Sequence, residues 1–193
     1  MKNDPEIILN VDQKSTSVEH EVVVYVDFLC PFCGMFQSRF SEKLRELVDR
    51  GTISLQYRAI AWIDQYSNGY HYSARAALAA QKLNESQSDL NFRYITKLFV
   101  RGVQPHEGQR FDPALAKFAS LAALADEVGA SDATVKNIAA LEFDPNLEDT
   151  LIQAQLAKGH ELREKNVIPS TPSFFVDGEL LDEFERAKWL DAH

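Results

Sequence analysis

The 193-residue chain is poor in cysteine, with only Cys30 and Cys33. A scaffold held together by disulfides would use more cysteines across longer loops, so this class of small secreted protein is excluded. No stretch approaches 18 apolar residues, which excludes a membrane-spanning helix from the sequence. The first residues also lack the apolar core of a signal peptide. We therefore expect either a cytosolic protein or one whose leader or anchor is missing from this sequence.

Basic residues are also in short supply, with 20 Lys and Arg against 29 Asp and Glu and a formal net charge of -9. A chain without a basic run is a poor partner for nucleic acid or for an anionic membrane surface. We expect neither contact. Apolar residues make up 45% and charged residues 25%, the usual mix of a soluble globular protein. The length favours one domain, or one domain with a large insertion.

The first half of the chain predicts a strand–helix–strand unit. Residues 22–28 form a nearly continuous apolar, β-branched run, which indicates a buried strand. Apolar residues at helical spacing then run from Met35 to Val48, and Gly51 closes the segment. Residues 53–60 largely alternate apolar and polar side chains, which indicates a second strand. Because a crossover joins them, we expect the two strands to be parallel.

The second half is predicted as a helical segment followed by a return to the sheet. From about Tyr70, apolar stripes at helical spacing continue for most of a hundred residues, with breaks at 102–113, 129–132 and 144–146. Residues 173–176 form a short β-like run, and Asp177-Gly178 favours a hairpin turn. Residues 179–181 would then form the returning strand of the hairpin. A last helix is expected over about 183–190. This order favours one α/β layer with a helical insertion.

The two cysteines lie in the motif Cys30-Pro31-Phe32-Cys33, where the first strand ends and a helix begins. A helix N-terminus offers unpaired N–H groups and the positive end of the dipole, and both favour a thiolate. The thiolate is the attacking species in disulfide exchange. We therefore expect Cys30 to be exposed at the helix start as the nucleophile, with Cys33 one turn in as the resolving cysteine. Pro31 suits the first helical turn because it has no N–H to leave unsatisfied.

A metal site is the main alternative for this cysteine pair. Zinc needs about four ligands, and the sequence holds no second cysteine pair. The histidines are scattered without zinc-ligand spacing: His20, His71, His106, His160 and His193. We expect no metal and no cofactor other than a redox-active Cys30–Cys33 disulfide. A structurally inert cysteine pair is a second alternative, although inert cysteines are usually buried in apolar surroundings.

A second candidate feature is the segment Thr171-Pro172, directly before the late strand. Pro172 can simply begin an edge strand. Alternatively, it forms a cis-proline turn beside the cysteines, since an X-Pro bond is the one place where the cis form is cheap. Such a turn would expose the Thr171 backbone to an extended substrate peptide. Together with the cysteine motif, the second interpretation is favoured.

This order of elements resembles the DsbA-like family of thioredoxin-fold proteins, in particular its actinobacterial and Gram-positive branch. The resemblance spans about 21–190 and is carried by residues 24–33 and 171–178. It implies an α/β, thioredoxin-like fold with a large helical insertion in a single domain of residues 1–193. The thioredoxin-like parts are expected at about 15–65 and 146–193 and the insertion at about 66–145. By resemblance, Cys30 is the nucleophile, Cys33 resolves, and Thr171-Pro172 is the cis-proline loop.

The chain departs from the family in two places. Pro-Phe separates the cysteines where the best-known enzyme has Pro-His, so its strong oxidising power does not simply transfer. Members often carry a buried acid six positions before the first cysteine, where this chain has Val24. Asp27 is the nearest acid on the strand and is a candidate proton acceptor for Cys33. The equal alternative is that Asp27 is a solvated residue at the end of the strand.

These features predict a thiol–disulfide oxidoreductase that forms, reduces or isomerises disulfides in cysteine-bearing protein substrates. The resemblance implies an extracytoplasmic disulfide oxidase, secreted or membrane-anchored, that a redox partner re-oxidises or reduces. Two alternatives stay open: a cytosolic thioredoxin-like reductase, and a non-redox chaperone or binding module that uses an apolar groove near Phe32 and Pro172.

Overall fold

A computed structural model describes residues 7–11, 17–100, 112–144 and 146–193. Its centre is a five-stranded sheet in the order β1-β3-β2-β4-β5. The strands are β1 (Ile7–Asn10), β2 (His20–Val26), β3 (Ile53–Ala59), β4 (Ser173–Val176) and β5 (Glu179–Leu181). β2 and β3 are parallel, as predicted, and the other neighbouring pairs are antiparallel. The late hairpin therefore lies directly beside the strand that leads to Cys30.

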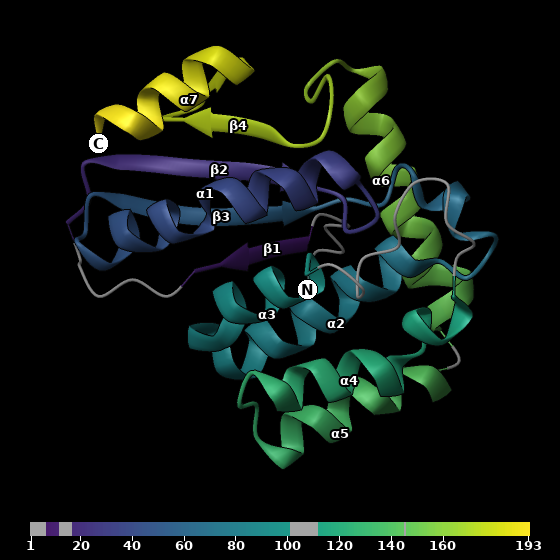
Figure 1. The fold of residues 1–193 in the computed structure, drawn as a ribbon. Coiled ribbons are helices and arrows are strands. Elements are labelled where there is room, and N and C mark those ends of the chain that lie inside the picture. The colour runs from purple at the N-terminus through teal and green to yellow at the C-terminus, as the bar shows by residue number, and fades with distance from the viewer. Residues whose placement is uncertain (1–6, 12–16, 101–111, 145) are drawn as a thin grey trace.

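Helices cover the sheet, and a second group of helices lies beyond its edge (Figure 1). Those of the described chain are α1 (Pro31–Asp49), α2 (Tyr72–Gln87), α3 (Asn91–Leu98), α4 (Phe118–Glu127), α5 (Asp132–Ala140), α6 (Gln153–Glu164) and α7 (Glu183–Ala192). Short turns of 3₁₀-helix occupy Asp64–Ser67, Ser88–Leu90, Pro113–Ala116 and Leu141–Phe143, and a π-helical turn spans Leu147–Ile152. In Figure 1, helices α2 to α5 gather beyond the β1 edge, whereas α7 lies beside β4.

The core joins the sheet to both groups of helices. β3 alternates buried and half-buried side chains, because one face of the strand carries the larger apolar residues. On α2, five alanines are fully buried: Ala74, Ala76, Ala77, Ala79 and Ala80. Such small side chains let this helix pack closely against β1, its neighbour in the fold. α2 also holds in place the segment that follows β3, and this segment contributes to the candidate active site.

The predicted fold class is confirmed, and most element positions agree within a few residues. The predicted break at 129–132 separates α4 from α5, which begins at Asp132. Asp144 and Asn146 lie outside the helices, as predicted, whereas residue 145 and most of the break at 102–113 lie outside the described residues. β1 is not predicted from the sequence. This strand has only four residues, and residues 12–16 beyond it are not described. Within the described residues it is an edge strand and pairs with β3.

Candidate active site

The cysteine motif lies at the junction of β2 and α1. Cys30 is the residue that caps α1, with an extended backbone, and Pro31 is the first helical residue. The main-chain N–H groups of Cys33 and Gly34 donate to the Cys30 carbonyl oxygen at 3.1 and 3.2 Å. Both cysteines are free thiols, so the structure represents the reduced state. The Cys30 sulfur is thus held at the helix N-terminus, where a negative charge is stabilised.

The late loop brings Thr171 against this sulfur. The Thr171–Pro172 peptide bond is cis. Cys30 Sγ donates to the Thr171 carbonyl oxygen at 3.3 Å. The expected exposure is wrong for both residues: Cys30 and Thr171 are each only 5% exposed. The reason is that the loop folds over the thiol and turns its carbonyl group inward.

The two thiols have opposite acidities. A hydrogen bond from Cys33 lowers the pKa of Cys30 to about 6 from an ordinary value of 9.0, and contacts with Thr171 and the N–H groups of Cys33 and Phe32 also lower it. Burial of Cys30 acts in the opposite direction and raises this pKa. For Cys33, which is 0% exposed, burial and the neighbouring Cys30 raise the pKa well above the ordinary value. Below its own pKa Cys30 keeps the proton that it donates to the Thr171 carbonyl oxygen, whereas at neutral pH Cys30 is the thiolate and Cys33 the thiol that stabilises it.

Asp27 is a buried carboxylic acid beside the cysteines. It is 0% exposed, so the alternative of a solvated residue at the strand end is wrong. Burial raises its pKa from 3.8 to about 7, despite hydrogen bonds that favour the charged form. These come from Ser73 Oγ at 2.5 Å, the Leu29 N–H at 2.9 Å and the Ile63 N–H at 3.2 Å. A group with this pKa exchanges its proton near neutral pH.

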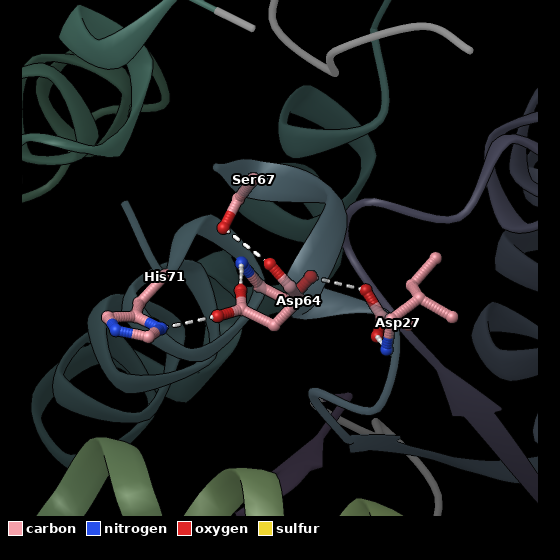
Figure 2. A network of polar contacts seen from close by, with 6 residues as sticks. Asp27, Asp64, Ser67 and His71 are labelled. Atoms are coloured by element: carbon pink, nitrogen blue, oxygen red, sulfur yellow. Dashed lines mark hydrogen bonds and ion pairs between the residues drawn. The ribbon is translucent and has the colours of Figure 1, made fainter. Parts of the chain in front are cut away.

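Ser73 connects Asp27 to a second buried acid, Asp64. Figure 2 shows Asp27, Asp64, Ser67 and His71 of this network. The Ser73 hydroxyl donates to Asp27, while its main-chain N–H donates to Asp64 Oδ1 at 2.8 Å. The other Asp64 oxygen lies 2.7 Å from Nδ1 of His71, and Ser67 Oγ donates to the Asp64 carbonyl at 2.6 Å. The network fixes the start of α2 against the end of β2. It therefore holds the Asp27 carboxyl in one orientation.

Ser73, Asp64 and His71 are not predicted as site residues from the sequence. Asp64 and His71 stand in the connection between β3 and α2, and Ser73 begins the helical segment. Their residue types suit helix caps and turns anywhere, so no motif marks them. One signal is present: a polar cluster directly before a long apolar helix indicates a cap that needs partners.

A groove runs from the cysteine motif along α1 to α7. Phe32 and Met35 stand on its rim and are 65% and 66% exposed. The groove encloses about 580 Å³ and is lined by Phe32, Met35, Phe36, Arg39, Phe40, residues 169–173, residues 180–183, Glu185 and Arg186. The predicted residues Phe32, Thr171 and Pro172 thus meet in one concave surface beside Cys30. Such a surface suits an extended peptide.

The described residues show neither a metal cluster nor a membrane-spanning helix. In those parts of the chain, no three His, Cys, Asp or Glu side chains gather closely enough to hold a metal ion. No helix there is both long enough and apolar enough to cross a bilayer.

Comparisons with known proteins define the class. A sequence model of the family described as Thioredoxin matches residues 15–192. Reduced DsbA from Mycobacterium tuberculosis is 26% identical, with a TM-score of 0.67 over 92% of this chain and 85% of that one. MdbA, a thiol-disulfide oxidoreductase from Corynebacterium matruchotii, gives a TM-score of 0.70 at 22% identity, over 97% and 87% of the two chains. The fold is therefore that of the DsbA-like thiol:disulfide oxidoreductases, and the predicted resemblance is confirmed.

The chain belongs to the thioredoxin family, whose sequence model covers more than half of it. Among its relatives is disulfide bond formation protein D of Bacillus subtilis (strain 168), 24% identical over 165 residues, which are 84% of this chain. The chain spans 65% of the length of that protein, or slightly less than two-thirds.

Proposed function

We propose that the protein exchanges disulfides with cysteine-bearing protein substrates, through the motif Cys30-Pro31-Phe32-Cys33 and without a further cofactor. One observation carries this proposal. The Cys30 sulfur lies at the N-terminus of α1, 3.3 Å from the Thr171 carbonyl oxygen, with Cys33 one helical turn away. Nucleophile, resolving thiol and a loop suited to hold a peptide thus converge on one sulfur atom.

The proposed reaction begins from the Cys30–Cys33 disulfide. A substrate thiolate attacks Cys30 Sγ, the S–S bond breaks, and the electron pair leaves with Cys33. Because Cys33 holds its proton strongly, it takes one up, and we assign Asp27 as the donor. A second substrate thiolate then attacks the substrate sulfur of the mixed disulfide and releases the Cys30 thiolate. The substrate has lost two electrons and the enzyme has gained them, and a redox partner must remove them again.

The acidity of Cys30 supports the oxidising direction. A stabilised thiolate stabilises the reduced enzyme, which makes its disulfide a better oxidant. The pKa of about 6 lies between about 7 for thioredoxin, a reductant, and about 3.5 for the strongly oxidising enzyme DsbA. We therefore place this protein between the two, as a moderate oxidase. Disulfide donation needs an oxidising compartment, so we also propose an extracytoplasmic location.

The equilibrium reduction potential of the Cys30–Cys33 pair tests the proposal. We expect a value between about −270 and −120 mV, near the middle of that interval, measured in glutathione buffers. A potential at the lower end would indicate a reductase instead. A pair that forms no disulfide anywhere in this range would overturn the redox function and favour the binding-module alternative.

The titration of Cys30 is a second expected result. The reduced protein should show an ultraviolet thiolate absorbance with a midpoint at about pH 6, because the Cys33 thiol and the N–H groups of the helix N-terminus stabilise the charge. The Cys30→Ser variant is the control and should lack this transition. A midpoint above pH 8 would show that the site does not activate Cys30.

A further inference from the structure

The groove beside the cysteines contains two arginines from different helices. Arg39 lies on α1 and Arg186 on α7, and both line the groove together with Phe32 and Pro172. The Arg39 guanidinium lies 4.8 Å from the centre of the Phe40 ring. The Arg186 guanidinium lies 5.9 Å from the same ring and 5.0 Å from that of Phe36. The aromatic side chains thus hold two cationic groups in fixed positions at one place.

Neither arginine has an ion-pair partner within the part of the chain that the structure describes. Arg186 Nε is moreover buried without a hydrogen-bond partner there. Other arginines of the fold do pair, as Arg45 with Asp49 and Arg75 with Glu142. A buried N–H group that lacks an acceptor is costly, so the arrangement calls for an acceptor from outside the chain.

The nearby carboxylates do not fill this role. Asp182 and Glu185 cap α7, each accepting a hydrogen bond from the main-chain N–H of the other, at 2.8 and 3.0 Å. Glu183 acts on Arg186 only through its charge, beyond ion-pair distance. Both guanidinium groups lie against the Phe40 ring. In keeping with this geometry, burial and then the charge of Arg39 lower the pKa of Arg186, and Glu183 acts in the opposite direction. An anion between the two guanidinium groups would relieve both costs.

We propose that Arg39 and Arg186 form a subsite for a carboxylate of the substrate peptide, so that the enzyme prefers cysteines with an acidic residue nearby. This proposal rests on the proposed function. A guanidinium presents paired N–H donors that match a carboxylate, which makes arginine the suitable residue for such recognition. The chain as a whole carries a net charge of -9. The preference must therefore come from this local pair, because the overall charge repels acidic peptides.

The helix geometry gives the expected spacing. Arg39 follows Cys30 by nine positions, which is about 13 Å along a helix at roughly 1.5 Å per residue. An extended peptide covers that length in about four residues at roughly 3.3 Å each. The acidic residue should therefore lie about four positions from the reacting cysteine.

Peptides that differ only at this position test the subsite. Acetylated and amidated cysteine peptides carry Glu, Gln or Lys about four residues from the cysteine, on either side, and the oxidised enzyme reacts with each. We expect the Glu peptide to react about tenfold faster than the Gln peptide, the size of one charge-assisted hydrogen bond. The advantage should shrink at high salt. A Gln peptide that ends at this position with a free carboxylate shows whether a chain end serves as well as a side chain.

Variants then assign the effect to the arginines. In Arg186→Gln and in Arg39→Gln, the ratio of Glu to Gln rates should fall toward one, and the double charge reversal R39E/R186E should favour the Lys peptide. Arg50→Gln is the matched control, since Arg50 is exposed near the far end of α1 and pairs with Glu46. Circular dichroism checks that each variant is folded.

The outcomes separate the two proposals. Equal rates for Glu and Gln peptides in the unchanged protein would overturn the subsite while leaving disulfide exchange intact. A preference that persists in both single arginine variants would overturn it as well. Failure to oxidise any peptide, together with failure to oxidise the uncharged dithiol dithiothreitol, would instead overturn the proposed function.

Discussion

Replacing Cys30 with serine is expected to abolish disulfide exchange, with a loss of activity on the order of 10³-fold or more. Cys30 is the sulfur that the helix N-terminus and Cys33 hold as a thiolate, and the loop at Thr171 contacts it directly. A hydroxyl group at the same place can neither form a disulfide nor carry charge near neutral pH. The measurement is the rate at which a reduced model substrate regains its disulfides in glutathione buffer.

Cys33→Ser is the matched variant, because it removes the other sulfur of the same motif. Its Cys30 still attacks a substrate disulfide, but no second thiol resolves the product. Mixed disulfides with substrates should therefore accumulate, visible on non-reducing gels and identified by mass spectrometry at Cys30. Full activity in Cys30→Ser, or trapping through Cys33 in that variant, would contradict the roles assigned to the two residues.

The sequence predicts the elements well where local pattern and tertiary structure agree. β4 and the hairpin at Asp177-Gly178 lie where residues 173–181 indicate them, because a short apolar run of β-forming residues and a turn that needs positive φ are both visible in the local sequence. The Cys30–Cys33 motif is equally visible, since a strand end followed by a proline predicts the helix start. Here neighbours in the sequence determine the geometry.

Burial around the site could not be predicted in the same way. The cover over Cys30 comes from Thr171, which is 141 positions away. Asp27 is buried because Ser73, from the start of α2, closes over it. Similarly, Arg39 on α1 and Arg186 on α7 are far apart in the sequence and meet only in the folded state. Periodicity shows which face of each helix is apolar, but not which polar side chains a crossing element will enclose.

The Asp27→Asn variant is expected to be more stable than the unchanged protein above pH 7. Asp27 has a pKa of about 7 in the folded state against 3.8 without burial. Between these values the folded state keeps a proton that the unfolded state releases, so stability falls as pH rises to 7 and is level above it. At about 1.4 kcal/mol per pH unit, the full cost of ionising Asp27 is about 4 kcal/mol. Asparagine avoids this cost but loses the hydrogen bond from the Ile63 N–H, about 1 kcal/mol.

Urea unfolding of the disulfide form, from pH 4.5 to 8.5, measures this difference without the titration of either thiol. We expect a gain of about 2 to 3 kcal/mol at pH 8 that shrinks to about zero near pH 4.5. Asp126→Asn is the control, since Asp126 is exposed on α4 and should change stability little at any pH. Equal pH dependence in Asp27→Asn and the unchanged protein would show that Asp27 titrates normally.

The same Asp27→Asn variant should lose activity while it gains stability. The resolving step needs a group that returns a proton to Cys33 or removes one, and asparagine does neither near neutral pH. We expect exchange through Cys33 to slow on the order of 100-fold and its rate to lose the inflection near pH 7. Attack by Cys30 alone, followed as alkylation by iodoacetamide, should change far less, because the helix N-terminus and Cys33 remain. A stabilised variant with an unchanged rate of resolution would make Asp27 a merely structural acid. Stability and activity that move in opposite directions would instead identify it as a buried acid kept for proton transfer, at a cost to the fold.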